Sequence, residues 1–142
     1  MKIHFVCTNN TFRSRMAEAY FNSLKIKDWV ATSSGIDAVN NIEGAIAWDT
    51  KDTLQNHNIL EYTNKDWTQT TKELIEDSDL VIFMEPTHAT YCEQTLHAKI
   101  PKHEIWNVID TDINKDKTIV VLESESTFQA VKKQVDALIT RI

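Results

Sequence analysis

A cysteine and an arginine stand six residues apart near the start of the chain, and their side chains could act together on a phosphate group. Cys7, Arg13 and Ser14 belong to the stretch Phe5-Val6-Cys7-Thr8-Asn9-Asn10-Thr11-Phe12-Arg13-Ser14. A cysteine thiolate is a strong nucleophile, and a guanidinium can hold two oxygens of a phosphate-like anion. This spacing indicates a nucleophile that faces a bound oxyanion.

The elements on either side of this stretch would hold it in place. Residues 3–6 form an apolar run typical of a buried strand, whereas Met16, Ala19 and Tyr20 follow at helical spacing. A loop that leads from a strand into a helix directs backbone N–H groups and the positive end of the helix dipole at one point. We therefore expect a phosphate-binding loop with Cys7 at its floor, in a field that favours the thiolate. Its members are Thr8, Asn9, Asn10, Thr11, Phe12, Arg13 and Ser14.

The rest of the chain predicts alternating strands and helices. Further strands are predicted at 29–33, 80–84 and 104–109, and helices at about 14–25, 47–57 and 87–99 and over the C-terminal residues. Residues 119–122 fit a strand or the start of that last helix. This alternation is typical of a single-domain α/β sandwich over residues 1–142, with a four-stranded parallel sheet and helices on both faces.

Threonines and an asparagine are predicted to mark several helix ends. Thr68 or Thr70 would cap a short helix that ends near Glu76, and Thr87 would cap the helix after the third strand. Asn58 would end the second helix, because asparagine tolerates the left-handed backbone conformation.

The loops that follow the four strands should share one edge of the sheet, where sites in parallel sheets lie. They carry Cys7, Ser33, Glu85 and Asp110. The polar side chains that could take part in chemistry are therefore expected to converge there.

Composition limits the classes of function. The net charge of −6 and the absence of a basic stripe argue against nucleic acid and anionic membranes as partners. No apolar run reaches membrane-spanning length, and a strand begins at once at the N-terminus, so a cytoplasmic location is expected. Cys7 and Cys92 are too few for a disulfide framework, and a reducing compartment suits a thiolate.

The Cys-x5-Arg-Ser pattern resembles the signature of the low-molecular-weight protein tyrosine phosphatase family, which includes arsenate reductases and protein-arginine phosphatases. Similar segments follow in the family's order: Thr-Ser-Ser-Gly at 32–35, Asp-Leu-Val-Ile-Phe-Met-Glu at 79–85, and Trp-Asn-Val-Ile-Asp at 106–110. The resemblance covers nearly the whole chain. It implies the family's three-layer fold and a cysteine-dependent phosphomonoester hydrolase, in the first instance a protein tyrosine phosphatase.

The resemblance also implies a mechanism. Cys7 would form a cysteinyl-phosphate while Arg13 and the loop amides hold the phosphoryl oxygens. Asp110 would protonate the leaving group and then activate water. The expected substrate is a phosphorylated protein or a small phosphomonoester, with inorganic phosphate as product.

Supporting residues and cofactors follow from the same comparison. Asn10, Ser14 and Ser33 match positions that support the loop by hydrogen bonds. No metal or other cofactor is expected, because the scheme needs none and the five histidines show no zinc-like spacing. The histidines are expected at the surface or at helix ends.

Several residues depart from the family's pattern. The segment Asp110-Thr111-Asp112-Ile113 lacks the proline and the aromatic residues that accompany the family's acid, so Asp112 remains an alternative to Asp110. Asn9 replaces a glycine, and Phe12 replaces a second cysteine. Glu85 replaces an aspartate and is expected to have a structural role.

Three alternatives stay open at this point. Thr11 matches the protein-arginine phosphatase branch, where a branched side chain could shape the pocket for a phosphoguanidinium group. Arsenate reduction would need two further cysteines; Met84 stands at the first of those positions, and Cys92 lies near the second. A non-catalytic phosphate-binding module would explain the missing Asp-Pro pair. Phe12 and Trp48 are candidate pocket walls.

Overall fold

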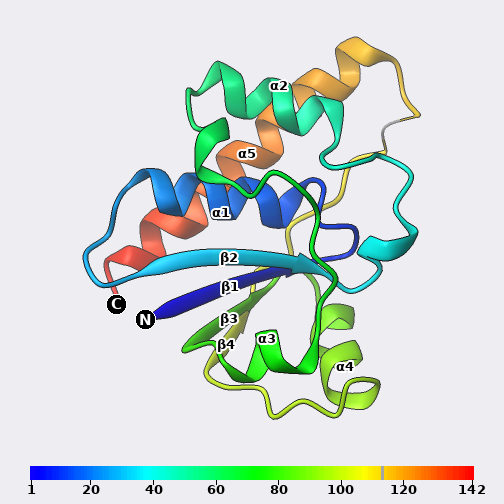
Figure 1. Cartoon of the computed structure of the whole chain (residues 1–142). Coiled ribbons are helices and arrows are strands. Elements are labelled where there is room, and N and C mark those ends of the chain that lie inside the picture. Colours follow the sequence, from blue (N-terminus) through cyan, green and yellow to red (C-terminus); the bar gives the residue numbers. More distant parts are fainter. Residues whose placement is uncertain (113) are drawn as a thin grey trace.

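The computed structural model describes residues 1–112 and 114–142, so Ile113 of the predicted acid segment lies outside the described residues. Four strands form one parallel sheet in the order β2-β1-β3-β4, with β1 and β3 in the centre (Figure 1). The strands are β1 Lys2–Cys7, β2 Val30–Gly35, β3 Leu80–Phe83 and β4 His103–Ile105. The predicted four-stranded parallel sheet is confirmed.

Helices cover both faces of the sheet. Figure 1 shows α1 Arg13–Ser23, α2 Trp48–Asn56 and α5 Lys117–Ile139 on one face, and α3 Lys72–Glu76 and α4 Pro86–Gln94 on the other. Two short 3-10 helices, η1 Ala38–Asn40 and η2 Leu60–Tyr62, interrupt the connections around α2. The predicted three-layer sandwich is confirmed. Among the described helices, none combines the length and the apolar character needed to cross a bilayer.

The two central strands are buried on both faces, which explains why β3 is continuously apolar. Ile3 and Phe5 of β1 pack into the core beneath α1 and α5, whereas Val6 packs with Val81 and Cys92 in a second core beneath α4. Alternate residues of a strand point to opposite faces, so each face of β1 fills one of these cores.

Two helix caps differ from the prediction. Thr71, not Thr68 or Thr70, caps α3, because its hydroxyl accepts a hydrogen bond from the Leu74 N–H at 3.2 Å. Glu85, not Thr87, caps α4, since Pro86 occupies the first helical position, where its missing N–H costs nothing.

Most of the remaining boundaries are close to those predicted, but α4 ends at Gln94 and not near Lys99. Residues 119–122 belong to α5, and Asn58 has the expected left-handed conformation (φ 57°) after α2. The fourth strand is shorter than the predicted 104–109 and ends at Ile105. After β4 the chain still forms a hydrogen bond to the residue that follows β3, because Val108 N–H donates to the Met84 carbonyl at 2.9 Å.

One histidine contradicts the expectation of a surface or helix-end position. His4 is fully buried in β1, where its ring nitrogens lie 2.6 Å from Thr32 Oγ1 and 2.7 Å from Ser34 Oγ. The neighbouring strand thus supplies hydroxyl partners that an apolar strand pattern does not reveal. Burial lowers the pKa of His4 to about 4, so the ring is neutral at pH 7.

Candidate active site

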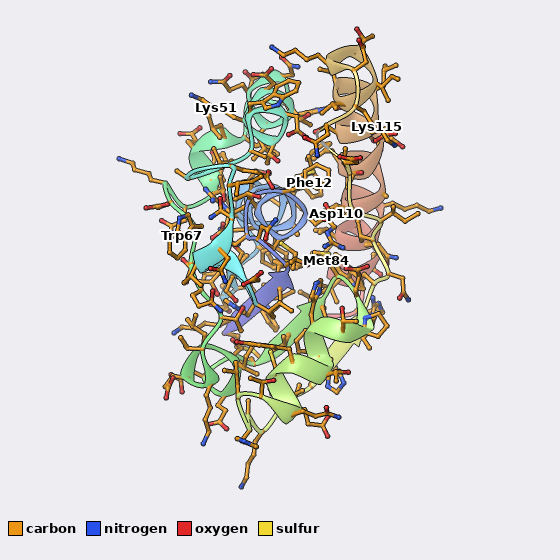
Figure 2. All side chains as sticks on the ribbon, turned by 90° about the vertical axis from the view of Figure 1, so that its right-hand side faces the viewer. Phe12, Lys51, Trp67, Met84, Asp110 and Lys115 are labelled. Carbon is orange, nitrogen blue, oxygen red and sulfur yellow. The ribbon has the colours of Figure 1, made fainter. Side chains whose placement is uncertain are left out.

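The loop between β1 and α1 holds the candidate nucleophile at the carboxyl edge of the sheet. Cys7 is 2% exposed, and it opens onto a cavity of about 150 Å³. Figure 2 looks onto this edge, and its labelled Phe12 and Asp110 lie close together beside α1. The cavity is lined by Cys7, Asn9, Thr11, Phe12, Arg13, Glu43, Asp110, Thr111 and Asp112.

A chain of hydrogen bonds ends at the cysteine sulfur. Asn10 Nδ2 donates to Ser33 Oγ at 2.9 Å and to Ser14 Oγ at 2.8 Å, and Ser14 Oγ lies 2.9 Å from Cys7 Sγ. Because the Ser14 oxygen already accepts from Asn10, its own hydrogen is free to donate to a thiolate. The structure therefore brings together the three side chains predicted to support the loop.

Backbone contacts fix the same loop against β2. Asn10 adopts the left-handed conformation (φ 56°), and its Oδ1 accepts a hydrogen bond from Thr68 N–H at 2.8 Å. The loop also packs directly on Gly35, where an added Cβ would lie 2.5 Å from the Thr8 carbonyl oxygen. Only glycine permits this approach, so the end of β2 sets the position of the loop.

Arg13 is buried beneath the cavity and is held by groups from two other strand ends. Its Nη1 donates to the Val108 carbonyl at 2.9 Å and lies 3.0 Å from Glu85 Oε2. Its Nη2 lies 3.4 Å from Thr8 Oγ1 and 3.6 Å from Asp110 Oδ2. The guanidinium therefore has a fixed orientation with counter-charges beside it, and Glu85 occupies the structural position expected for it.

His88 contacts the phosphate loop, and the sequence interpretation did not anticipate this contact. Its buried ring accepts a hydrogen bond at Nδ1 from Glu85 N–H at 3.1 Å, so the proton lies on Nε2 and is donated to Thr8 Oγ1 at 3.0 Å. Burial and the nearby Arg13 charge lower the pKa of His88 to about 4. The available signal was the capping pattern, a glutamate followed three residues later by a histidine.

Both candidate acids line the cavity, but only one reaches the arginine. Asp110 has a half-exposed carboxylate whose Oδ1 accepts from Thr111 N–H at 2.9 Å, leaving Oδ2 directed at Arg13. The Asp112 carboxylate instead accepts from Asn114 N–H at 2.9 Å within its own loop. The structure thus brings the Asp110 carboxylate to the Arg13 guanidinium.

The wall opposite Asp110 contains a buried hydroxyl and an unanticipated carboxylate. Thr11 is 1% exposed, and its Oγ1 makes no geometrically complete hydrogen bond among the described residues, although it lies close enough to the Glu43 carboxyl to lower the pKa of that group. Glu43 lies beside it and contacts Asn9, whose Nδ2 is 3.4 Å from Glu43 Oε1. Burial raises the pKa of Glu43, and the neighbouring Thr11 and Asn9 side chains offset part of that rise.

Of the two residues predicted to form pocket walls, Phe12 lies at the cavity and Trp48 lies at the molecular surface. Phe12 lines the cavity, as expected. Trp48 does not; it is 37% exposed and lies beneath Lys117 of α5, with Nζ 5.8 Å from the ring centroid. The Trp48 prediction is therefore wrong, because the first turn of α2 faces α5.

The two residues named for the arsenate reductase alternative lie in the core. Met84 and Cys92 are both fully buried, and burial raises the pKa of the Cys92 thiol to about 11. In residues 1–112 and 114–142, no three His, Cys, Asp or Glu side chains cluster in a way that could hold a metal ion.

A cysteine at the end of a central strand, facing a buried arginine at the start of the next helix, defines a cysteine-based phosphate-binding site. The sequence model of the family described as low molecular weight phosphotyrosine protein phosphatase matches residues 2–141. The chain therefore belongs to this family and is a phosphatase, as its signature predicted. No curated protein matches the chain by sequence.

Solved structures share the whole fold. A low molecular weight protein tyrosine phosphatase from T. tengcongensis is 24% identical and has a TM-score of 0.80, with 100% of this chain and 99% of that chain covered. The YwlE arginine phosphatase from Geobacillus stearothermophilus is 25% identical with a TM-score of 0.71, covering 98% and 93%. The Drosophila arginine phosphatase DARP is 18% identical with a TM-score of 0.81, covering 99% and 96%.

Proposed function

We propose that this chain is a cytoplasmic, single-domain phosphatase that releases phosphate from phosphoarginine side chains in preference to phosphotyrosine. The observation that carries the substrate class is the Thr11 hydroxyl, which is buried in the wall of the catalytic cavity without a partner. Buried polar groups normally have a hydrogen-bond partner, and a guanidinium N–H that enters the cavity beside Glu43 would supply one to this hydroxyl.

The charge of the cavity wall supports the same substrate. Glu43, Asp110 and Asp112 line the cavity, and a phosphoguanidinium keeps positive charge on its outer nitrogens, which donate well to carboxylates. A phosphotyrosine ring has no such charge and would prefer aromatic walls. Among the described residues, Phe12 is the only aromatic one in the lining. YwlE and DARP, both named arginine phosphatases, share the fold.

In the proposed mechanism, the Cys7 sulfur attacks phosphorus as the bond from phosphorus to the guanidino nitrogen breaks. Arg13 and the loop amides hold the phosphoryl oxygens, and Asp110 gives its proton to the leaving nitrogen. Asp110 then takes a proton from water, which attacks the cysteinyl-phosphate and releases inorganic phosphate and the thiolate.

The other branches receive less support. A relay through Cys92 would require a thiol that can reach the cavity, whereas this one is fully buried in the core beneath α4. A reducing cytoplasm is proposed because Cys7 must stay a free thiol, as it is here.

Phosphate release from phosphoarginine and from a phosphotyrosine peptide, measured side by side at pH 7, tests the proposal. The wild type should favour phosphoarginine, and Cys7→Ser should release phosphate from neither. Thr11→Val removes only the hydroxyl and should lower the phosphoarginine rate about tenfold, the effect of an unpaired guanidinium N–H, while the aryl rate is kept.

Thr50→Val is the matched control, because Thr50 also has a buried hydroxyl without a partner but does not line the cavity. It should leave the ratio of the two rates unchanged. A wild type that prefers the phosphotyrosine peptide would contradict the proposed substrate and assign the chain to the tyrosine branch. A Thr11→Val variant with an unchanged ratio would contradict the role of the Thr11 hydroxyl in substrate choice.

A further inference from the structure

A second arginine of α1 is buried behind the phosphate loop. Arg15 is 1% exposed, and its guanidinium reaches three separate segments of the chain. Its Nε donates to Thr63 Oγ1 at 2.7 Å, its Nη1 donates to the carbonyl oxygens of Ala45 at 2.8 Å and Asn10 at 3.2 Å, and its Nη2 donates to the Asn64 carbonyl. One side chain thus ties the loop to the segments before α2 and after η2.

The contact with the Asn10 carbonyl sets the orientation of the Asn10–Thr11 peptide, and Thr11 lines the catalytic cavity. In a planar trans peptide the C=O and the following N–H point in opposite directions. Because Arg15 holds the Asn10 carbonyl from behind, the Thr11 N–H must point away from Arg15, and Thr11 lines the cavity. Asn10 is already in the left-handed conformation, where a bond to its carbonyl restricts a peptide flip.

Arg15 keeps its charge despite its burial, because a counter-charge lies beside it. Arg15 Nε is 3.8 Å from Glu18 Oε1, and that oxygen also accepts from Thr63 and Ser33 hydroxyls at 2.6 and 3.0 Å. Burial lowers the pKa of Arg15, whereas the charges of Glu18 and of a Cys7 thiolate oppose this. Glu18 thus helps to fix the guanidinium behind the phosphate loop.

We propose that Arg15 is a positioning residue for the phosphatase reaction, which presets the Asn10–Thr11 peptide for phosphate by holding the Asn10 carbonyl. It does not touch the substrate and acts through the loop. The inference rests on the family's phosphatase activity and not on the choice between phosphoarginine and phosphotyrosine.

The dissociation constant of inorganic phosphate, measured by calorimetry, tests this role in Arg15→Ala and Arg15→Lys. Both variants should bind phosphate at least tenfold more weakly, because an ammonium keeps the charge but lacks the fork that spans the carbonyls of Asn10, Ala45 and Asn64. The KM for an aryl phosphate should rise by a similar factor.

Added guanidinium should restore part of the phosphate affinity of Arg15→Ala and leave the wild type unchanged. Arg15 lines a cavity of about 690 Å³, together with Ile46, Lys51 and Leu60, through which the ion can reach the vacated position. Lys51 is labelled in Figure 2, on α2 and away from Asp110.

Asn22→Ala is the matched control. Asn22 also lies on α1 and binds a neighbouring segment, through Nδ2 to the Tyr62 carbonyl at 3.2 Å and the Ala31 carbonyl at 3.0 Å, but it has no bond to the phosphate loop. It should lose thermal stability and keep its phosphate affinity.

Arg15 variants that are folded at the assay temperature and bind phosphate within twofold of Asn22→Ala would overturn the proposal. Guanidinium that restores only the melting temperature of Arg15→Ala would likewise assign Arg15 a purely structural role. If Arg15→Ala does not fold, Arg15→Lys decides by the same criterion. Because phosphate binding needs no turnover, failure of the proposed substrate would appear separately, in the rates alone.

Discussion

At the scale of single residues, the site combines one nucleophile with charges that are already paired. Arg13 faces both Glu85 and Asp110, and Arg15 faces Glu18. Paired guanidinium groups keep a fixed orientation, which is a condition for electrostatic stabilisation of a transferring phosphoryl group. A bound phosphate thus meets an arginine whose direction is set before it arrives.

Replacing Asp110 by Asn should separate the acid from the binding groups. The variant should lower kcat for a substrate with a poor leaving group about 100-fold, the usual contribution of a general acid, and should leave the dissociation constant of phosphate nearly unchanged. Steady-state kinetics and phosphate titration check this. Asp112→Asn is the control, and a larger loss of kcat in Asp112→Asn would move the acid role to that residue.

At the scale of elements, β2 positions the loop without contributing to its chemistry. Gly35 ends β2 directly under the phosphate loop, and Ile36 N–H and Asp37 N–H donate to the carbonyls of Cys7 and Thr8 at 3.0 and 2.8 Å. The backbone of the phosphate loop therefore packs directly on the end of β2, and its shape depends on Gly35 having no Cβ.

Gly35→Ala should displace the backbone of the phosphate loop. The new Cβ would meet Thr8 O at 2.5 Å and Asn10 N at 2.6 Å, both backbone atoms, so we expect a loss of about 1–3 kcal/mol in the free energy of unfolding and a phosphate affinity at least about tenfold weaker. Denaturant unfolding and phosphate titration measure the two effects.

Gly44→Ala serves as the comparison. Gly44 has φ 81°, which strains an alanine, but an added Cβ has no neighbour within 4 Å. That variant should lose stability and retain phosphate affinity; equal affinity losses in both variants would show that close packing on β2 is not what shapes the loop.

At the scale of the whole molecule, buried histidines make stability depend on pH. His4 and His88 have pKa values of about 4 in the folded chain against 6.5 as the ordinary value. Between these values the unfolded chain binds more protons, so stability is full above pH 6.5 and falls as the pH drops toward 4. Buried Glu18 and Asp49 and half-buried Glu43, whose pKa values burial raises, act in the opposite direction.

The histidine contribution can be isolated by substitution. Between pH 7 and pH 5, His4 should lower the free energy of unfolding by about 2 kcal/mol. Its ring is buried beside Lys2 and two hydroxyl groups, which do not stabilise the charged form. His4→Gln should therefore show a flatter decline in the free energy of unfolding over this interval. Denaturant titrations at several pH values compare the slopes, and identical slopes would contradict a neutral buried His4.

The order of local patterns along the chain predicted the features that depend on short-range physics. The apolar run before Cys7, the helical spacing after Ser14 and the later alternation of strands and helices fix a parallel sheet with a loop at its carboxyl edge. Sequence alone therefore determined the fold class and the positions of Cys7, Arg13 and Asp110 at one edge.

Only the tertiary structure decided which distant side chains complete the site. Glu43 comes from an aperiodic loop, His88 from the first turn of α4, and Arg15 from the buried side of α1. Trp48, in contrast, faces α5 and not the cavity. The periodicity of apolar residues indicates which face of an element is buried. Contacts between segments far apart in sequence depend instead on how the packed layers bring the loops together. No local pattern encodes that arrangement.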